Sequence, residues 1–202
     1  SPTAADTFSA VRLLTPAIRT SSIRDVIAIK EETGLPVIGL VKIQYPGYEG
    51  YITPTMKEVD DLVAAGSDVV ALDCTLRKRG DGITVNEFIA QIKEKYPDII
   101  LMADISNYEE GINAWKCGVD IVGTTMSGYT DYTSKKDEPD YELMERLAKD
   151  TDIPVIGEGK IHYPDQAVKA LQTGVWAIVV GGAITRPLEI AQRFQKAIEA
   201  GK

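Results

Sequence analysis

The sequence has few of the side chains that build metal centres and disulfide frameworks. Its 202 residues include two cysteines, Cys74 and Cys117, which form no CxxC pair, and one histidine, His162. Zinc sites need several closely spaced Cys or His ligands, so we predict no metal site and no disulfide framework. A reducing cytoplasm is the expected location. A nucleophilic cysteine paired with His162 is the alternative, but we expect packing roles for these three residues.

Basic runs and long apolar runs are also missing. The chain has 22 Lys and Arg against 30 Asp and Glu, a formal net charge of −8. Neither nucleic acid nor an anionic membrane is therefore an expected partner. No apolar stretch approaches the ~20 residues that span a bilayer, and the N-terminus lacks a signal-peptide pattern. A hydrophobic content of 44% is typical of one soluble globular domain, here residues 1–202.

Short apolar runs alternate with amphipathic helical patterns along the chain. Helix starts are indicated by Ser22 and by capping boxes at Thr55–Glu58, Thr84–Glu87 and Ser106–Glu109. Further apolar stripes predict helices around 143–147, 167–171 and 190–198. The intervening strands are expected to end near residues 42, 73, 104, 125, 158 and 182. Fully apolar strands separated by helices predict parallel β-α units.

This repeat favours an α/β fold of the (β/α)8 TIM-barrel class, whose units average ~31 residues. A doubly wound open sheet is the rival, but no glycine-rich fingerprint follows a first strand. Six strands are clear, and a seventh is expected at residues 16–19. Residues 1–15 are atypical of strand and helix, so the first barrel strand is not visible. We therefore expect a barrel that is incomplete at its N-terminus or that begins outside this sequence.

Polar residues stand at the end of each predicted strand. Active sites of this fold lie at the C-terminal ends of the strands, so these side chains are expected to converge on one mouth. They are Arg19, Lys42, Asp73, Asp104, Thr124 with Thr125, Glu158, and Gly181-Gly182. We predict that Thr124 binds substrate, whereas for Asp73 an ordinary exit of the strand to the surface is the alternative.

Lys42 and Glu158 stand out because each interrupts an apolar run. A lysine partly removed from water can act as a base near neutral pH, and a carboxylate can carry a second proton. A structural ion pair at the rim is the alternative. Lysine chemistry itself leaves two reactions open, which are proton abstraction next to a carbonyl and a Schiff-base aldolase.

An anion site is predicted close to the C-terminus. An apolar run ends in Gly181-Gly182, and Arg186 and Pro187 follow at the start of an amphipathic helix. Glycines let backbone N–H groups approach an anion, and an arginine fork suits a phosphate. An ordinary strand-to-helix turn is the alternative.

In this order and spacing, the motifs resemble those of the N-acetylmannosamine-6-phosphate 2-epimerase family. They are PVIGLVK (36–42), YITPT (51–55), ALDCT (71–75), LMADIS (101–106), GVDIVGTT (118–125), SGYT (127–130), EGKI (158–161) and VVGGAITRP (179–187). The chain departs from the family pattern at Ile43-Gln44, which replaces a charged pair, and it lacks the glutamine of the family's first strand.

The resemblance implies cofactor-independent interconversion of N-acetylmannosamine 6-phosphate and N-acetylglucosamine 6-phosphate by a homodimer, in sialic acid or amino-sugar breakdown. It implies that Lys42 and Glu158 are the catalytic pair and that Arg19 and Asp104 hold the sugar. It also implies that the phosphate is held by Gly181, Gly182 and Arg186. A Schiff-base phosphosugar lyase and a catalytically impaired phosphosugar-binding barrel remain as alternatives. The polar segment 127–139 is a hypothetical lid.

Overall fold

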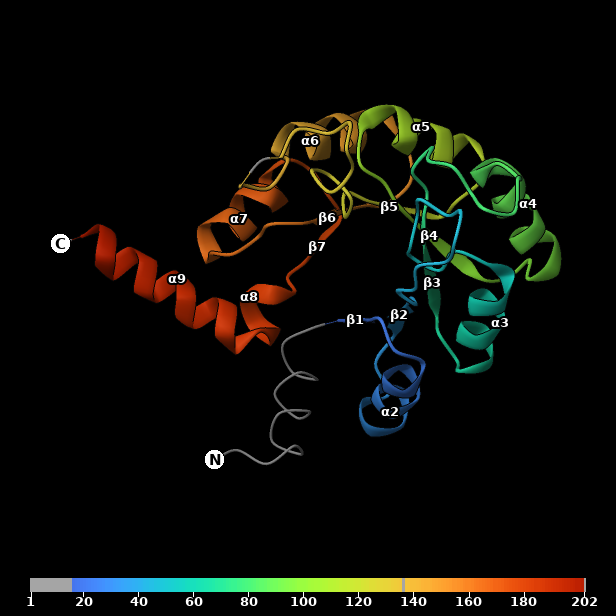
Figure 1. Cartoon of the computed structure of the whole chain (residues 1–202), viewed down its shortest axis with the longest axis horizontal. Coiled ribbons are helices and arrows are strands. Elements are labelled where there is room, and N and C mark those ends of the chain that lie inside the picture. The colour runs from blue at the N-terminus through green and yellow to red at the C-terminus, as the bar shows by residue number, and fades with distance from the viewer. Residues whose placement is uncertain (1–15, 136, 202) are drawn as a thin grey trace. The chain divides into compact units, whose positions relative to one another are not determined.

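Strands and helices alternate along the chain as the sequence predicts (Figure 1). The structure is a computed structural model that describes residues 16–135 and 137–201. The prediction of a missing or incomplete first strand falls on residues 1–15 and lies outside the described residues. The chain forms two compact units, Ser1–Asp104 with Asn113–Ile121 and Ile105–Ile112 with Val122–Lys202.

Four parallel strands form the sheet of the first unit, and they pair in chain order. A doubly wound sheet would reverse that order at a switch point. All five residues of β3 are buried, as expected for a strand covered on both faces. The predicted seventh strand is β1. The four strands are β1 (Ile18–Thr20), β2 (Val37–Gly39), β3 (Val69–Asp73) and β4 (Ile100–Asp104).

Local capping determines where the helices of this unit begin. The Glu58 carboxylate accepts the Thr55 N–H at 3.0 Å, and the Glu87 carboxylate accepts the Thr84 N–H at 2.7 Å. Both predicted capping boxes are therefore confirmed. The predicted stop at Gly34 is also confirmed, with a left-handed φ of 66°. The helices are α2 (Ile23–Thr33), α3 (Met56–Ala64) and α4 (Val85–Lys95).

The later part of the chain continues the alternation with parallel pairs β5–β6 and β6–β7. Helices α6 and α7 pack on β6 and β7 respectively. The predicted stripe of α6 is confirmed, because Leu143, Met144 and Leu147 are buried. The elements are α5 (Tyr108–Lys116), β5 (Ile121–Gly123), α6 (Tyr141–Asp150), β6 (Val155–Glu158), α7 (Pro164–Gln172), β7 (Ala177–Val179), α8 (Gly182–Thr185) and α9 (Pro187–Ala200).

One strand prediction is wrong at the residue that matters most, because Lys42 does not end β2. The strand stops at Gly39, and Lys42 forms an isolated antiparallel bridge with Ile52. The amide of Asp73, at the end of β3, donates to the Ile52 carbonyl at 2.9 Å. The segment Tyr51–Thr53 therefore lies between Lys42 and β3, and this insertion ends the direct pairing of the two strands.

The capping box predicted at Ser106–Glu109 is also wrong. The amide and hydroxyl of Ser106 both donate to Glu110, each at 2.7 Å. The Asn107 side chain accepts the Glu110 amide at 3.0 Å, so Asn107 acts as the cap and α5 begins at Tyr108. Two adjacent cap-forming residues and two adjacent glutamates make this register ambiguous in sequence.

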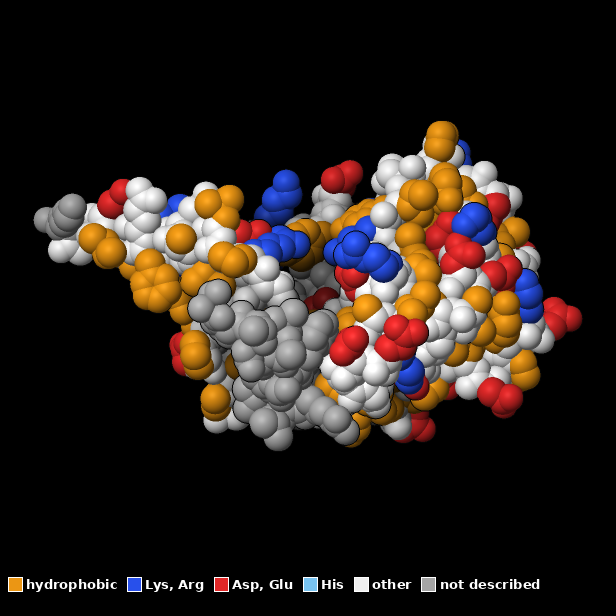
Figure 2. All heavy atoms as spheres, turned by 90° about the horizontal axis from the view of Figure 1, so that it is seen from below, with side chains coloured by type: hydrophobic (Ala, Val, Ile, Leu, Met, Phe, Trp, Pro, Cys, Tyr) orange, Lys and Arg blue, Asp and Glu red, His pale blue; other side chains and the backbone are white. Residues whose placement is uncertain are grey.

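The C-terminal helix exposes much of its apolar side chain surface. Leu188, Phe194 and Ile198 are each more than 60% exposed, and Figure 2 shows apolar side chains along α9. The prediction that Pro187 opens the last helix is confirmed, and the one-turn helix α8 precedes it. None of the described helices is long and apolar enough to cross a membrane.

Candidate functional site

Arg19 and Asp104 form a buried ion pair in the first unit. An Arg19 terminal nitrogen (Nη2) lies 2.6 Å from Asp104 Oδ2, and the two side chains are 7% and 0% exposed. The other terminal nitrogen (Nη1) donates to the Met102 sulfur at 3.3 Å. This ion pair thus links β1 to the end of β4. Two of the residues that the sequence assigns to sugar binding are brought together.

Lys42 is exposed and is held through its backbone. The amide of Ile43 donates to the Tyr51 carbonyl at 2.9 Å, and the amide of Thr53 donates to the Val41 carbonyl at 2.7 Å. These two bonds flank the bridge between Lys42 and Ile52. The lysine therefore stands on a short antiparallel ladder, with its side chain in solvent.

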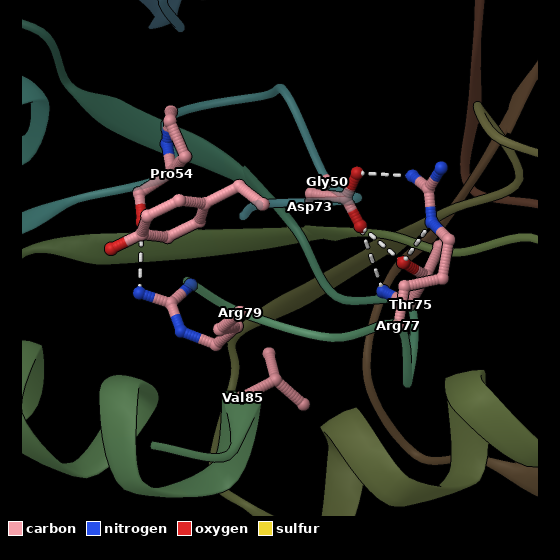
Figure 3. Close-up of a pocket in the computed structure, with 8 residues that line it drawn as sticks. Gly50, Pro54, Asp73, Thr75, Arg77, Arg79 and Val85 are labelled. Carbon is pink, nitrogen blue, oxygen red and sulfur yellow. Dashed lines mark hydrogen bonds and ion pairs between the residues drawn. The ribbon is translucent and has the colours of Figure 1, made fainter. Parts of the chain in front are cut away.

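Asp73 is buried, which argues against the alternative of an ordinary exit of the strand to the surface. Its carboxylate lies 2.7 Å from an Arg77 terminal nitrogen and accepts the Thr75 amide at 3.1 Å, as Figure 3 shows. Burial raises the pKa of the Asp73 carboxyl, and hydrogen bonds from Thr75 and the charge of Arg77 oppose that rise. A Cβ at Gly50 would lie 2.9 Å from the Asp73 carboxyl carbon, so the loop passes directly over this carboxylate.

The cavity beside this cluster is small. Its volume is about 10 Å³, and its lining includes Tyr48, Asp73, Arg77 and Arg79. That is room for about one water molecule. Arg79 fills part of the space, since it donates to the Pro54 carbonyl at 2.8 Å (Figure 3). Asp73, Arg77 and Arg79 therefore hold the loop that contains Gly50 in place, and the cavity beside them has no room for a sugar.

Thr124 and Thr125 both contact Glu158 in the second unit. The Thr124 hydroxyl donates to the Glu158 carbonyl at 2.8 Å and accepts the Glu158 amide at 3.0 Å. The Thr125 hydroxyl donates to Glu158 Oε2 at 3.1 Å. Thr124 is fully buried, so its hydroxyl is used on protein backbone. The contact of Thr125 with the carboxylate is one that the sequence reasoning did not assign.

Gly182 and Arg186 lie together at the start of the C-terminal helices. Arg186 Nη1 is 2.7 Å from Glu189 Oε1, in an exposed pair. The Glu189 hydrogen bond raises the pKa of Arg186 further. A Cβ at Gly182 would lie 2.9 Å from Glu189 Oε2 and 3.4 Å from Arg186 Cδ, whereas Gly181 has open space around its Cα. The predicted anion site thus contains an arginine that already has an anionic partner.

The packing roles predicted for the two cysteines and the histidine are supported for Cys74, whereas Cys117 and His162 are half-buried. Cys74 is fully buried. Burial raises the pKa of the Cys117 thiol and lowers the pKa of His162. A raised thiol pKa is the opposite of what an activated nucleophile needs. The described residues contain no group of three or more His, Cys, Asp or Glu side chains that could hold a metal ion.

A second cavity, of about 270 Å³, lies in the second unit between the starts of α5 and α6 and the segment 127–140. Its lining includes Ser106, Tyr132, Asp140 and Arg146, and none of the site residues predicted from the sequence. Tyr132 donates to Glu110, and Ser127 donates to Asp140 at 2.8 Å. These bonds hold the segment in the structure, and its role as a lid stays a prediction.

The family comparison covers nearly the whole chain. The model described as "Putative N-acetylmannosamine-6-phosphate epimerase" matches residues 7–200. A Caldanaerobacter subterraneus protein described as "Putative N-acetylmannosamine-6-phosphate 2-epimerase" is 56% identical over 88% of this chain and 75% of its own length. A Clostridioides difficile protein of the same description is 51% identical over 90% of this chain and 81% of its own length.

Solved structures support the same relationship. The N-acetylmannosamine-6-phosphate 2-epimerase from Clostridium perfringens has a TM-score of 0.89 and 45% identity, over 96% of this chain and 84% of that one. A thiamine phosphate pyrophosphorylase from Pyrococcus furiosus, 20% identical with a TM-score of 0.59, shares the fold over 90% of this chain and 81% of its own. The predicted TIM-barrel class is thereby confirmed. The chain belongs to the N-acetylmannosamine-6-phosphate 2-epimerase family of isomerases.

Proposed function

We propose that this chain interconverts N-acetylmannosamine 6-phosphate and N-acetylglucosamine 6-phosphate by inverting C2. The observation that carries the proposal is the family match across residues 7–200. In the open-chain sugar the C2 proton is adjacent to the C1 aldehyde, so its removal gives an enolate. Return of a proton to the opposite face inverts the centre. The reaction moves protons only and is balanced without a redox cofactor.

Lys42 takes the C2 proton in this proposal, and Glu158 assists ring opening or carries the second proton. The support for Lys42 is the antiparallel ladder that fixes its backbone opposite Ile52. Its exposed position differs from the partly desolvated lysine that the sequence predicts. The support for Glu158 is a carboxylate aligned by Thr125 at 3.1 Å. Positive charge next to a developing enolate lowers the barrier, and the Lys42 ammonium and Arg19 are the groups proposed for that task.

The remaining predicted residues bind the substrate in this proposal. Arg19, held by its ion pair with Asp104, donates to the sugar hydroxyls in this proposal. Asp104 and Thr124 complete the sugar contacts, and the phosphate binds at Gly181, Gly182 and Arg186. The enzyme is further proposed to act as a homodimer in the cytoplasm, on a small phosphorylated amino sugar.

Proton exchange at C2 tests the proposal directly. The protein is incubated with N-acetylmannosamine 6-phosphate in deuterated water, and loss of the C2 proton signal is followed by NMR. The wild-type chain should exchange C2 and form both epimers. Lys42→Ala should bind the sugar phosphate and exchange nothing, and Glu158→Gln should lose most turnover. Undiminished exchange in Lys42→Ala would refute the lysine base, and covalent trapping by borohydride would indicate Schiff-base chemistry instead.

A further inference from the structure

The backbone around Lys42 depends on Thr53, eleven residues further along the chain. The arm Tyr51–Thr53 runs antiparallel to the arm that ends in Lys42, and it is bonded on its other side to the end of β3. Ile52, opposite Lys42, is 1% exposed, and its carbonyl accepts the Asp73 amide at 2.9 Å. The position of Lys42 is therefore set through this inserted arm.

Thr53 supplies a side-chain link that the backbone ladder alone does not make. Its hydroxyl donates to the Ala71 carbonyl of β3 at 2.7 Å and accepts the Val41 amide at 3.2 Å. Its own amide donates to the Val41 carbonyl at 2.7 Å. Both backbone polar groups of Val41, the residue before Lys42, are thus bonded to Thr53. The side chain is fully buried and cannot touch a substrate in solvent.

Thr53 adopts this position in a backbone conformation that its side chain disfavours. Its φ is 46°, and among the described residues only Lys160 is another non-glycine residue with positive φ. A β-branched residue rarely adopts this region, because its side chain strains the backbone there. Glycine or asparagine would adopt the conformation more easily. What threonine adds over glycine is the hydroxyl that joins Val41 to Ala71.

We propose that Thr53 is a positioning residue for Lys42, acting through its hydroxyl. The proposal rests on the role proposed for Lys42 in removing the C2 proton. The strained, buried threonine fixes the lysine-bearing arm against β3, so that the amine reaches C2 at a defined place. Loss of the hydroxyl leaves the lysine present and the substrate contacts intact, but allows the arm to shift.

Three variants distinguish the effect of losing the Thr53 hydroxyl from an effect on folding. Thr53→Val keeps the branched shape and strain without the hydroxyl, Thr53→Gly removes both the strain and the hydroxyl, and Thr53→Ser retains the hydroxyl. A misplacement of about 1 Å can reduce turnover by ~100-fold. We therefore expect Val and Gly to lower kcat for C2 exchange by roughly 10- to 100-fold, with KM changed by less than about threefold. The Ser variant should retain kcat within about threefold.

Thr33 provides a matched control in the same unit. It is also buried, and its hydroxyl donates to the Ile29 carbonyl at 2.7 Å and accepts the Leu35 amide at 3.1 Å. Thr33→Val therefore removes an equivalent backbone link at the end of α2, where the hydroxyl bonds Ile29 and Leu35 rather than the arm that carries Lys42. It should lower the melting temperature and leave kcat unchanged, so a fall in kcat would show that general loosening, not lysine placement, is responsible.

Amide hydrogen exchange of the peptides covering 41–54 gives a readout that does not need activity. The Ile43 and Thr53 amides should lose protection in Thr53→Val and Thr53→Gly and keep it in Thr53→Ser and Lys42→Ala. If Thr53→Val and Thr53→Gly keep the wild-type kcat while Lys42→Ala is inactive, the role of Thr53 is refuted and the proposed function is not. Full C2 exchange by Lys42→Ala would refute the proposed function and this inference together, whatever the amide protection of the Thr53 variants.

Discussion

The Thr124 hydroxyl bonds to both backbone polar groups of Glu158, at 2.8 Å to the carbonyl and 3.0 Å from the amide. A hydroxyl has a single proton to donate, and here it is donated to protein. A sugar hydroxyl could therefore use only the remaining acceptor capacity of Thr124. The geometry gives Thr124 a second task, which is to hold the strand end that carries Glu158.

The first prediction follows from this bond pair. Thr124→Val should remove the hydrogen bonds between the Thr124 hydroxyl and the Glu158 backbone, at a cost of about 1–3 kcal/mol in the free energy of unfolding. It should lower kcat more than it raises KM, because Glu158 moves while the other sugar contacts remain. Thr124→Ser is the control and should preserve both constants. An increase in KM alone would assign Thr124 to substrate binding only.

Removal of one partner from the Arg19–Asp104 pair should be costly. Arg19→Ala leaves a carboxylate that is 0% exposed without its cation, so the free energy of unfolding should fall by about 3–5 kcal/mol. The double variant Arg19→Met with Asp104→Asn should be more stable than Arg19→Ala. The control is Arg24→Ala, which breaks an exposed pair with Asp25 and should change stability by less than about 1 kcal/mol. Urea unfolding measures all three, and equal losses from Arg19→Ala and Arg24→Ala would contradict the expectation.

Because Arg186 pairs with Glu189, we expect replacements of these two residues to change KM for the phosphosugar in opposite directions. Arg186→Ala should raise KM for the phosphosugar by about tenfold or more, and should leave any activity on the unphosphorylated sugar unchanged. Glu189→Gln should lower KM by a few-fold, because the carboxylate that competes with the phosphate for Arg186 is removed. Lys196→Ala, a charge change further along α9, should alter neither value. Equal effects of Arg186→Ala on both sugars would refute the phosphate assignment.

Asp68 should make stability depend on acid pH. Burial raises the pKa of its carboxyl, but hydrogen bonds from Lys30 at 2.9 Å and the Val37 amide at 2.7 Å outweigh burial and lower that pKa below the ordinary value of an aspartate. A lowered folded-state pKa means that the contribution is present above pH 3.8 and is lost as pH falls through the folded value. The carboxylate is partly exposed, so Asp68→Asn should cost about 1 kcal/mol at pH 7. Its stability should then fall less steeply than that of the wild type below pH 4, as measured by urea unfolding across pH.

Local signals were sufficient for much of the fold. The capping boxes of α3 and α4 lie within four residues of chain, and β3 is a continuous apolar run, so all three elements were placed correctly from sequence. The end of β2 was not predicted correctly, because the segment that ends the strand, Tyr51–Thr53, lies about ten residues beyond Lys42. No local pattern reports that Tyr51–Thr53 lies between Lys42 and β3. The same limit applies to Asp73, whose carboxylate is covered by the loop at Gly50, 23 residues earlier in the chain.

The candidate residues could be predicted from their positions at strand ends and from the family resemblance, whereas the residues that hydrogen-bond to them could not. A strand end identifies Glu158, yet only the fold shows which hydroxyl reaches its carboxylate and which one bonds its backbone. Threonine is common in strands and turns, so Thr53 and Thr125 carry no distinguishing signal in sequence. Arg186 was recognisable by its charge after two glycines, whereas its partner Glu189 is one acidic residue among the 30 of the chain.

The inserted arm Tyr51–Thr53 also determines which residues of the loop between Lys42 and Tyr51 can be exchanged. The bonds that anchor Lys42 involve only the two arms and β3, whereas Pro46 and Gly47 lie exposed between the arms. Exchanges or insertions at this turn alter the surface that the loop presents to solvent and leave the lysine's anchoring bonds in place. The turn is therefore a position at which residues can be exchanged, by evolution or by engineering, without relocating the lysine.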